Sequence, residues 1–184
     1  TEYRTIALAG TMKGKRDAAD WSLKNREEQG YVAAYIRECL KDIAADITEQ
    51  GPQTVRAADL LHLRSDFTFR LNDGQTIGSL LEALHPTPAV CGLPKDKARR
   101  FILSNESVAR EYYSGFAGIT GVCGTTQLYV TLRCMQIDGR KCRLYAGGGL
   151  LPSSTEQQEW DETEAKMQTM MRCLCAEQNT ENDV

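Results

Sequence analysis

The sequence predicts an α+β fold in which antiparallel sheets pack against helices. Three observations favour it: apolar residues recur every three or four positions in the first and last parts of the chain, apolar and polar residues alternate in between, and turn signals separate the alternating runs. With 184 residues, the chain is long enough for one domain with its own core. We expect that domain over residues 1–175, followed by a polar tail over 176–184.

In the first half, a short strand over residues 3–8 precedes a long helix, which we expect from about Asp17 or Ala18 to Ile47. Its apolar stripe consists of Val32, Ile36, Leu40, Ile43 and Ile47. Gly51-Pro52 is expected to end it. Extended segments follow over 53–56, 60–64 and 67–71, then a turn at Asn72-Asp73-Gly74 and a helix over 76–84, which His85-Pro86 stops.

In the second half, a short helix over 95–103 leads into three antiparallel strands. The strands are expected over 117–123, 127–135 and 142–146, and the last helix over 155–175. On that helix, the spacing predicts one apolar face made of Trp160, Met167, Met170, Met171 and Leu174.

The amino-acid composition argues against several classes of function. The net charge of −3 argues against a strong electrostatic hold on nucleic acid or on an anionic membrane, and no apolar run approaches the roughly 20 residues that cross a bilayer. Seven cysteines without a CxxC pair, beside two histidines, make a zinc site an unlikely interpretation. We expect these thiols to be mostly buried and reduced, in a cytoplasmic protein.

A few polar residues interrupt apolar patterns. Glu28 falls on the apolar stripe of the first helix, where a carboxylate is costly unless it is paired or binds a metal. Arg133 interrupts an apolar strand and either reaches into a cleft to bind a carboxylate or lies exposed on a half-open sheet. Glu162 and Lys166 are four apart, so they form either a solvated salt bridge or the rim of a pocket. Gly147-Gly148-Gly149 is either a tight turn or a loop that binds an anion through its N–H groups.

Seven segments in order carry a resemblance over about residues 6–174. They are Leu8-Ala9-Gly10-Thr11, Lys24-Asn25-Arg26-Glu27-Glu28-Gln29, residues 84–94 with His85-Pro86-Thr87-Pro88-Ala89, Tyr112-Tyr113-Ser114-Gly115, Thr131-Leu132-Arg133, residues 144–149, and residues 159–166. Together they resemble the chorismate-utilising enzymes, most closely isochorismate synthases, whose fold is a large α/β sandwich. The chain corresponds to the carboxy-terminal portion, and about half of the sandwich is expected here.

The resemblance implies a role for each matching residue. Magnesium would be held by Glu28, Glu159 and Glu162, and would anchor the ring carboxylate of chorismate near Gly10 and Thr11. The enolpyruvyl carboxylate would be bound by Tyr113, Arg133, Gly147 and Lys166. His62, which its sequence position alone would class as structural, matches a histidine that lines the catalytic pocket. The implied activity is conversion of chorismate to isochorismate, for menaquinone or siderophore biosynthesis.

The chain also departs from the family pattern. The family's general base and general acid lie upstream of the Leu-Ala-Gly-Thr segment, so the chain is interpreted as a fragment that lacks both and is inactive alone. Lys13 and Lys15 follow that segment and cannot take the role of the base. Gln29 and Gly148 stand where relatives often carry histidine and alanine. Alternatives are a salicylate or anthranilate-type synthase, or a non-catalytic chorismate-binding module. Exposed sheet edges would favour self-association.

Overall fold

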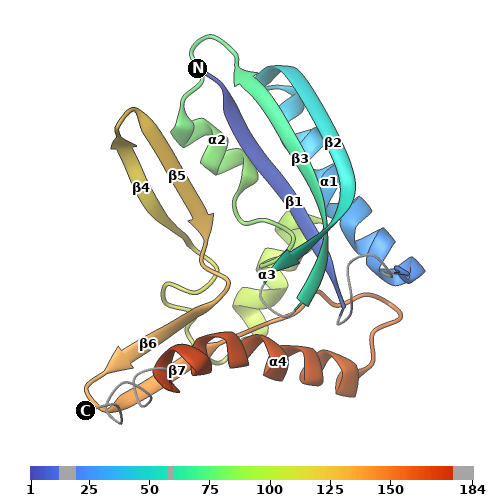
Figure 1. The fold of residues 1–184 in the computed structure, drawn as a ribbon, viewed down its shortest axis with the longest axis vertical. Coiled ribbons are helices and arrows are strands. Elements are labelled where there is room, and N and C mark those ends of the chain that lie inside the picture. The colour runs from blue at the N-terminus through green and yellow to red at the C-terminus, as the bar shows by residue number, and fades with distance from the viewer. Residues whose placement is uncertain (13–19, 58–59, 176–184) are drawn as a thin grey trace, which may run out of the picture. The chain divides into compact units, whose positions relative to one another are not determined.

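The computed structural model describes residues 1–12, 20–57 and 60–175, in two compact units, Thr1–Ala89 and Val90–Val184. Each unit combines antiparallel strands with two helices, which confirms the predicted α+β class (Figure 1). Lys13, Lys15 and the predicted tail over 176–184 lie outside the described residues. Among the described residues, no helix has the length and apolar character to cross a bilayer.

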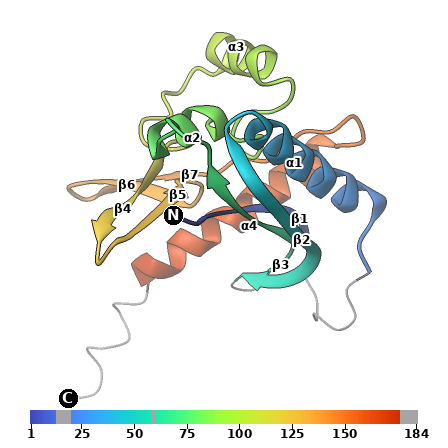
Figure 2. The ribbon, with the colours of Figure 1, turned by 90° about the horizontal axis from the view of Figure 1, so that it is seen from above.

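The first unit is a three-stranded antiparallel sheet with two helices on one side. Strands β1 (Tyr3–Met12), β2 (Ala44–Ala57) and β3 (Leu60–Leu71) stand in the order β1-β3-β2. Helices α1 (Leu23–Lys41) and α2 (Ile77–Leu84) lie on the same side of the sheet (Figure 2). The core between them contains Ala7, Ala9, Val32, Ala33, Ile36, Leu40, Ala44, Phe67, Phe69 and Leu80.

Helix α1 is shorter than its apolar stripe predicts. Ser22 caps its start by accepting a hydrogen bond from the Asn25 N–H, and Lys41 is its last residue. Ile43 still packs against the core, but from Ala44 the backbone pairs with β3. The predicted extension to Ile47 is therefore wrong, because a strand ladder replaces the helix where the apolar spacing happens to continue.

The predicted end of that helix, Gly51-Pro52, lies inside β2. The strand has an irregular register there, between Gln50 and Gln53, which accommodates a proline that cannot donate a ladder hydrogen bond. Strand β3 is likewise continuous, although two separate segments, 60–64 and 67–71, were expected. The α2 prediction is confirmed: Thr76 caps the helix and His85 follows its last residue.

The second unit contains two hairpins and two helices. Helix α3 (Lys95–Asn105) precedes the hairpin of β4 (Phe116–Val122) and β5 (Thr125–Val130). The hairpin of β6 (Cys134–Asp138) and β7 (Lys141–Tyr145) follows, and then α4 (Glu156–Cys175). The predicted strand over 127–135 is thus two strands, and Arg133 lies in the bend between them rather than within a strand. Beyond the β5 ladder, the Thr131 N–H still donates to the carbonyl of Gly115 and the Thr131 carbonyl accepts from the Ser114 N–H, and the chain bends two residues later at Arg133.

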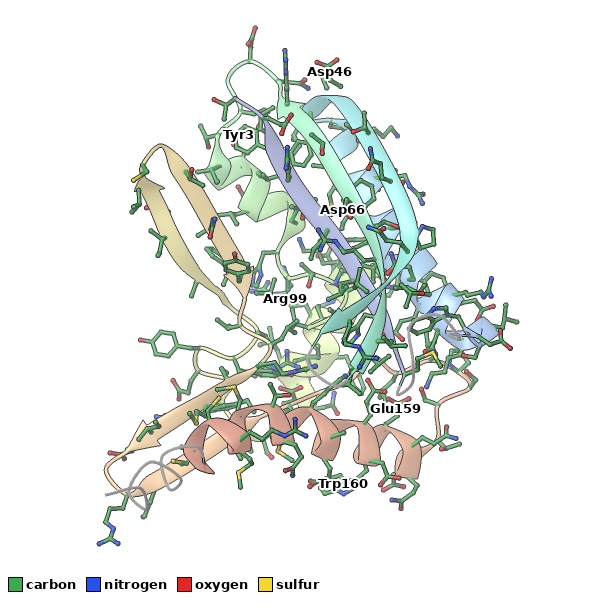
Figure 3. All side chains as sticks on the ribbon, in the orientation of Figure 1. Tyr3, Asp46, Asp66, Arg99, Glu159 and Trp160 are labelled. Carbon is green, nitrogen blue, oxygen red and sulfur yellow. The ribbon has the colours of Figure 1, made fainter. Side chains whose placement is uncertain are left out.

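The exposures of two neighbouring side chains on α4 show which side of this helix is shielded from solvent. Glu159 is only 8% exposed and Trp160 is 62% exposed, and their side chains point in different directions from α4 (Figure 3). The predicted apolar face is therefore wrong at Trp160, Met171 and Leu174, which are exposed, whereas Met167 and Met170 are partly buried. The six cysteines described as free thiols are all at least partly exposed, contrary to the expectation that most are buried.

Candidate functional site

Three of the predicted site residues meet at one end of the sheet in the first unit. Gly10 lies at an irregularity in the β1–β3 register and has φ of 68°. The His62 ring is buried, and its Nδ1 lies 3.1 Å from the Gly10 carbonyl oxygen and 3.3 Å from the Thr11 hydroxyl. Because a carbonyl oxygen only accepts, the contact with Gly10 places a ring proton on Nδ1.

A glycine is required at position 10 for two reasons. Its positive φ disfavours other residues, and a Cβ there would come within 3.1 Å of the Asn25 carbonyl oxygen on α1. At Gly10, strand β1 therefore lies against the first turn of α1. Glu28 lies one turn further along the same helix and is half-buried, whereas Glu27 is exposed.

Gln29 is the buried residue of this helix turn. Its side chain is 2% exposed, and its Nε2 donates to the Ala7 carbonyl on β1 and to the Ser65 hydroxyl on β3, both at 3.2 Å. The amide thereby ties α1 to two strands of the sheet. These hydrogen bonds give Gln29, the residue after Glu28, a structural role in this chain.

In the second unit, the Tyr113 side chain lies between an arginine and a glycine. The Tyr113 ring stacks on Tyr145 with centroids 5.6 Å apart. Its hydroxyl oxygen would lie only 2.7 Å from a Cβ on Gly147. The Arg110 guanidinium lies 5.8 Å from the centre of the Tyr113 ring. Burial raises the pKa of Tyr113 above its usual range, and the positive charge of Arg110 opposes this shift.

Lys166 connects α4 to the glycine segment. Its ammonium group donates to the Gly147 carbonyl oxygen at 3.0 Å and pairs with Glu162 at 2.6 Å. The Lys166 side chain is only 13% exposed, so this is not the fully solvated salt bridge that the sequence left open. The next residue of the glycine segment, Gly148, also lies close to α4. A Cβ on Gly148 would lie 3.2 Å from Glu159 Oε2 and 3.9 Å from Lys166 Nζ. Glu159 Oε1 accepts a hydrogen bond from the Ser154 hydroxyl at 2.5 Å.

Arg133 is the cation of this cluster that lacks a hydrogen-bonded partner among the described residues. It is half-buried, and loss of hydration lowers the pKa of its guanidinium, while Tyr113 and Glu162 nearby raise it. Lys166 and Arg110, by contrast, are each paired with a glutamate. A half-buried guanidinium with free donors is suited to a carboxylate, which it binds through two parallel hydrogen bonds.

The glycine segment adds further donors. Within the described part of the chain, no acceptor takes the backbone N–H groups of Gly147, Gly148 or Gly149. Successive free N–H groups form anion-binding concavities. The second unit therefore brings together Tyr113, Arg133, Gly147 and Lys166, the four residues predicted to bind one carboxylate.

The three predicted magnesium ligands are divided between the units. Glu159 and Glu162 lie three residues apart on α4, and Glu28 lies on α1. Among the described residues, no group of three or more acidic, histidine or cysteine side chains is close enough to hold a metal. The donor type still fits magnesium, which prefers oxygen ligands and often binds through only one or two carboxylates.

The sequence interpretation missed several residues that support this site. Glu106 and Arg110 form an ion pair, but residues 106–110 follow the end of α3 and are not helical, so their spacing of four residues gave no helical signal. Tyr145 lies in a segment that carries the resemblance but was given no role. Ser154 had no sequence signal beyond its place just before α4.

Comparisons with known proteins find relatives over most of this chain. Isochorismate synthase DhbC of Bacillus subtilis (strain 168) is 36% identical over 155 residues, which are 83% of this chain and 39% of that protein. The solved structure of MenF, the menaquinone-specific isochorismate synthase from Escherichia coli, matches with a TM-score of 0.80 at 34% identity, covering 92% of this chain and 41% of that chain.

Anthranilate synthase component I from Streptococcus pneumoniae matches with a TM-score of 0.78 at 24% identity, over 92% of this chain and 40% of that chain, which shows a shared fold. The chain thus spans about 40% of the length of these relatives. The family described as "Chorismate binding enzyme" matches residues 1–175. This chain therefore belongs to the family of chorismate-binding enzymes.

Proposed function

We propose that this chain supplies the carboxylate-binding part of an isochorismate synthase. The observation that carries the proposal is Arg133, a half-buried guanidinium with free donors near Tyr113, in the same unit as the N–H groups of the glycine segment. Chorismate carries two carboxylates, and one of them matches this group of donors. The family relationship and the named isochorismate synthases among the relatives support this substrate.

The other carboxylate is assigned to magnesium and to the first unit. Glu28, Glu159 and Glu162 would hold the ion, which would offset the charge of the ring carboxylate when bound. Glu159 suits this role because its carboxylate is buried and is held by the Ser154 hydroxyl. Gly10 and Thr11 would lie near the ring carboxylate. His62 would line the pocket, with its ring fixed by the Gly10 carbonyl oxygen.

The proposed reaction adds water at one ring carbon and removes hydroxide from another. In the family, a lysine and a glutamate that precede the Leu8-Ala9-Gly10-Thr11 segment move the protons, and neither can be assigned to a residue of this chain. We therefore propose that the 184-residue chain binds chorismate without converting it, and that turnover requires a longer protein that carries those residues.

The first experiment measures chorismate binding by isothermal titration calorimetry with and without magnesium. Arg133→Lys should weaken binding by about 10- to 100-fold, because hydrogen bonds to charged groups contribute about 1.5–3 kcal/mol and lysine cannot bind a carboxylate in two places. Arg140→Lys is the matched control, since Arg140 is exposed in the turn of the β6–β7 hairpin. Equal affinities for the two variants would contradict the role of Arg133.

Product analysis by liquid chromatography then identifies the reaction. Isochorismate is expected from a longer protein and none from the 184-residue chain. Salicylate would instead indicate a related synthase on the same fold, and anthranilate formed with ammonia would indicate an anthranilate synthase. Turnover by the 184-residue chain itself would refute the proposal that the acid and base are missing.

A further inference from the structure

Arg110 ties three separate segments of the second unit together. Its Nε donates to Glu106 Oε2 at 2.6 Å, and its Nη2 also bonds the Glu106 carboxylate. Its Nη1 donates to the Val90 carbonyl oxygen at 2.7 Å and to the Ser114 hydroxyl at 2.9 Å. The guanidinium therefore connects the first residue of the unit, the residue that follows α3, and the turn that carries Tyr113.

That turn has a backbone that few side chains favour. Glu111 and Ser114 have φ of 48° and 67°, so the residues on both sides of Tyr112-Tyr113 adopt left-handed conformations. Residues other than glycine persist there only when the surroundings hold them. Arg110 supplies part of that hold, because its side chain bonds Ser114 and its carbonyl oxygen accepts from the Tyr113 N–H at 2.8 Å.

The same guanidinium lies against the ring of Tyr113. The position of this ring is critical because its hydroxyl lies where even one methyl group on Gly147 would collide with it. We propose that Arg110 is a positioning residue: its bonds to Glu106, Val90 and Ser114 hold Tyr113 against Gly147 and thereby align the tyrosine hydroxyl beside Arg133. The consequence for chorismate rests on the proposed function, whereas the placement of Tyr113 does not.

Lysine cannot replace arginine in this role. The guanidinium makes bonds in several fixed directions in one plane, and an ammonium group is a compact charge that cannot span the same three partners. Arg110→Lys keeps a positive charge near the Tyr113 ring but cannot make the hydrogen bonds to Glu106, Val90 and Ser114 together. Arg110→Met loses both. Comparing the two variants separates the effect of the charge from the effect of the fixed geometry.

The test is a double-mutant cycle with Tyr113→Phe, measured as chorismate affinity by calorimetry. Arg110→Met is expected to weaken binding by about 10- to 100-fold in the natural background, and by less than about threefold when Tyr113 is already phenylalanine. Arg110→Lys should also weaken binding by at least about fivefold. An equal loss in both backgrounds, or no loss in either, would overturn the proposal.

A second readout does not require chorismate. Tyrosine labelled with ¹³C at Cζ reports each phenol by NMR, and Tyr113→Phe identifies the signal of Tyr113 among the seven tyrosines. Arg110→Met should raise the pKa of Tyr113 further, because the arginine charge lowers it, and Arg110→Lys should change it less. Both variants should also shift the Tyr113 signal at neutral pH.

Urea unfolding shows whether the variants remain folded. If Arg110→Met does not fold, Arg110→Lys carries the test. If the natural chain fails to bind chorismate, the proposed function is refuted and the NMR readout still decides the placement of Tyr113. An unchanged Tyr113 signal and pKa in a folded variant would overturn the positioning role.

Discussion

Two adjacent glycines should respond very differently to the same added methyl group. A Cβ on Gly147 would lie 2.7 Å from the Tyr113 hydroxyl oxygen, whereas ordinary contacts begin at 3.4 Å, so the two atoms would have to separate by about 0.7 Å. A Cβ on Gly148 would lie 3.2 Å from Glu159 Oε2, so a shift of about 0.2 Å suffices. Neither position has the positive φ that would add backbone strain.

The Tyr113 ring has little freedom to make that larger shift. It is stacked on Tyr145 and lies next to the guanidinium of Arg110. Overpacking a well-filled site costs about 1–3 kcal/mol, which corresponds to about 5- to 150-fold in affinity if the tyrosine hydroxyl is displaced from its working position. Gly147→Ala is therefore expected to weaken chorismate binding within that range, and Gly148→Ala by less than about threefold.

Calorimetry with chorismate and magnesium measures the two affinities, and urea unfolding measures the stability of both variants. The free energy of unfolding of Gly147→Ala should fall by no more than about 1–3 kcal/mol, the usual cost of overpacking. If Gly147→Ala binds chorismate as tightly as the natural chain, then the contact between Tyr113 and position 147 does not determine the site. A larger loss for Gly148→Ala than for Gly147→Ala would also refute the reasoning.

Two further predictions concern stability. Gly30 is exposed within α1, and a Cβ there would meet nothing within 4 Å. Gly30→Ala should therefore raise the free energy of unfolding, measured by urea denaturation, by about 0.5–1 kcal/mol. A decrease would show that the position is not an ordinary helical one. The hydrogen bond from Arg110 holds the pKa of Glu106 below its usual range. The ionised carboxylate therefore stabilises the fold at pH values above the pKa of Glu106 in the unfolded chain. This stabilisation is lost as the pH falls through the pKa of Glu106 in the folded chain. Glu106→Gln should therefore cost about 0.2–1 kcal/mol at pH 7, and its unfolding curve should converge with that of the natural chain below about pH 4, whereas a constant difference would exclude this origin.

The sequence predicted elements best where a local signal marks each end. Helix α2 has a capping threonine before it and His85-Pro86 after it, and both signals act within a few residues. The end of α1 has no comparable signal, because the spacing of Ile43 and Ile47 continues the helical pattern. Only pairing with β3, a segment more than a dozen residues away along the chain, makes residues 44–50 a strand.

Arg133 illustrates the same limit at the site. Its position within an apolar run drew attention to it, and the structure places it near Tyr113 and Glu162. Its place in a strand was wrong, because the pairing of β5 ends irregularly at Thr131, against Ser114 and Gly115 of a turn that lies elsewhere in the chain. The contribution of Arg110 was missed for a similar reason, since no sequence pattern pairs it with Val90 or Ser114.

The two tryptophans give each unit a separate optical reporter. Trp21 in the first unit is 7% exposed, and its indole N–H donates to the Thr54 hydroxyl at 2.9 Å. Trp160 in the second unit is 62% exposed. The fluorescence of Trp160 is therefore expected to be red-shifted and readily quenched by iodide, and that of Trp21 to be blue-shifted and shielded. With Trp160→Phe, the remaining emission follows the unfolding of the first unit alone.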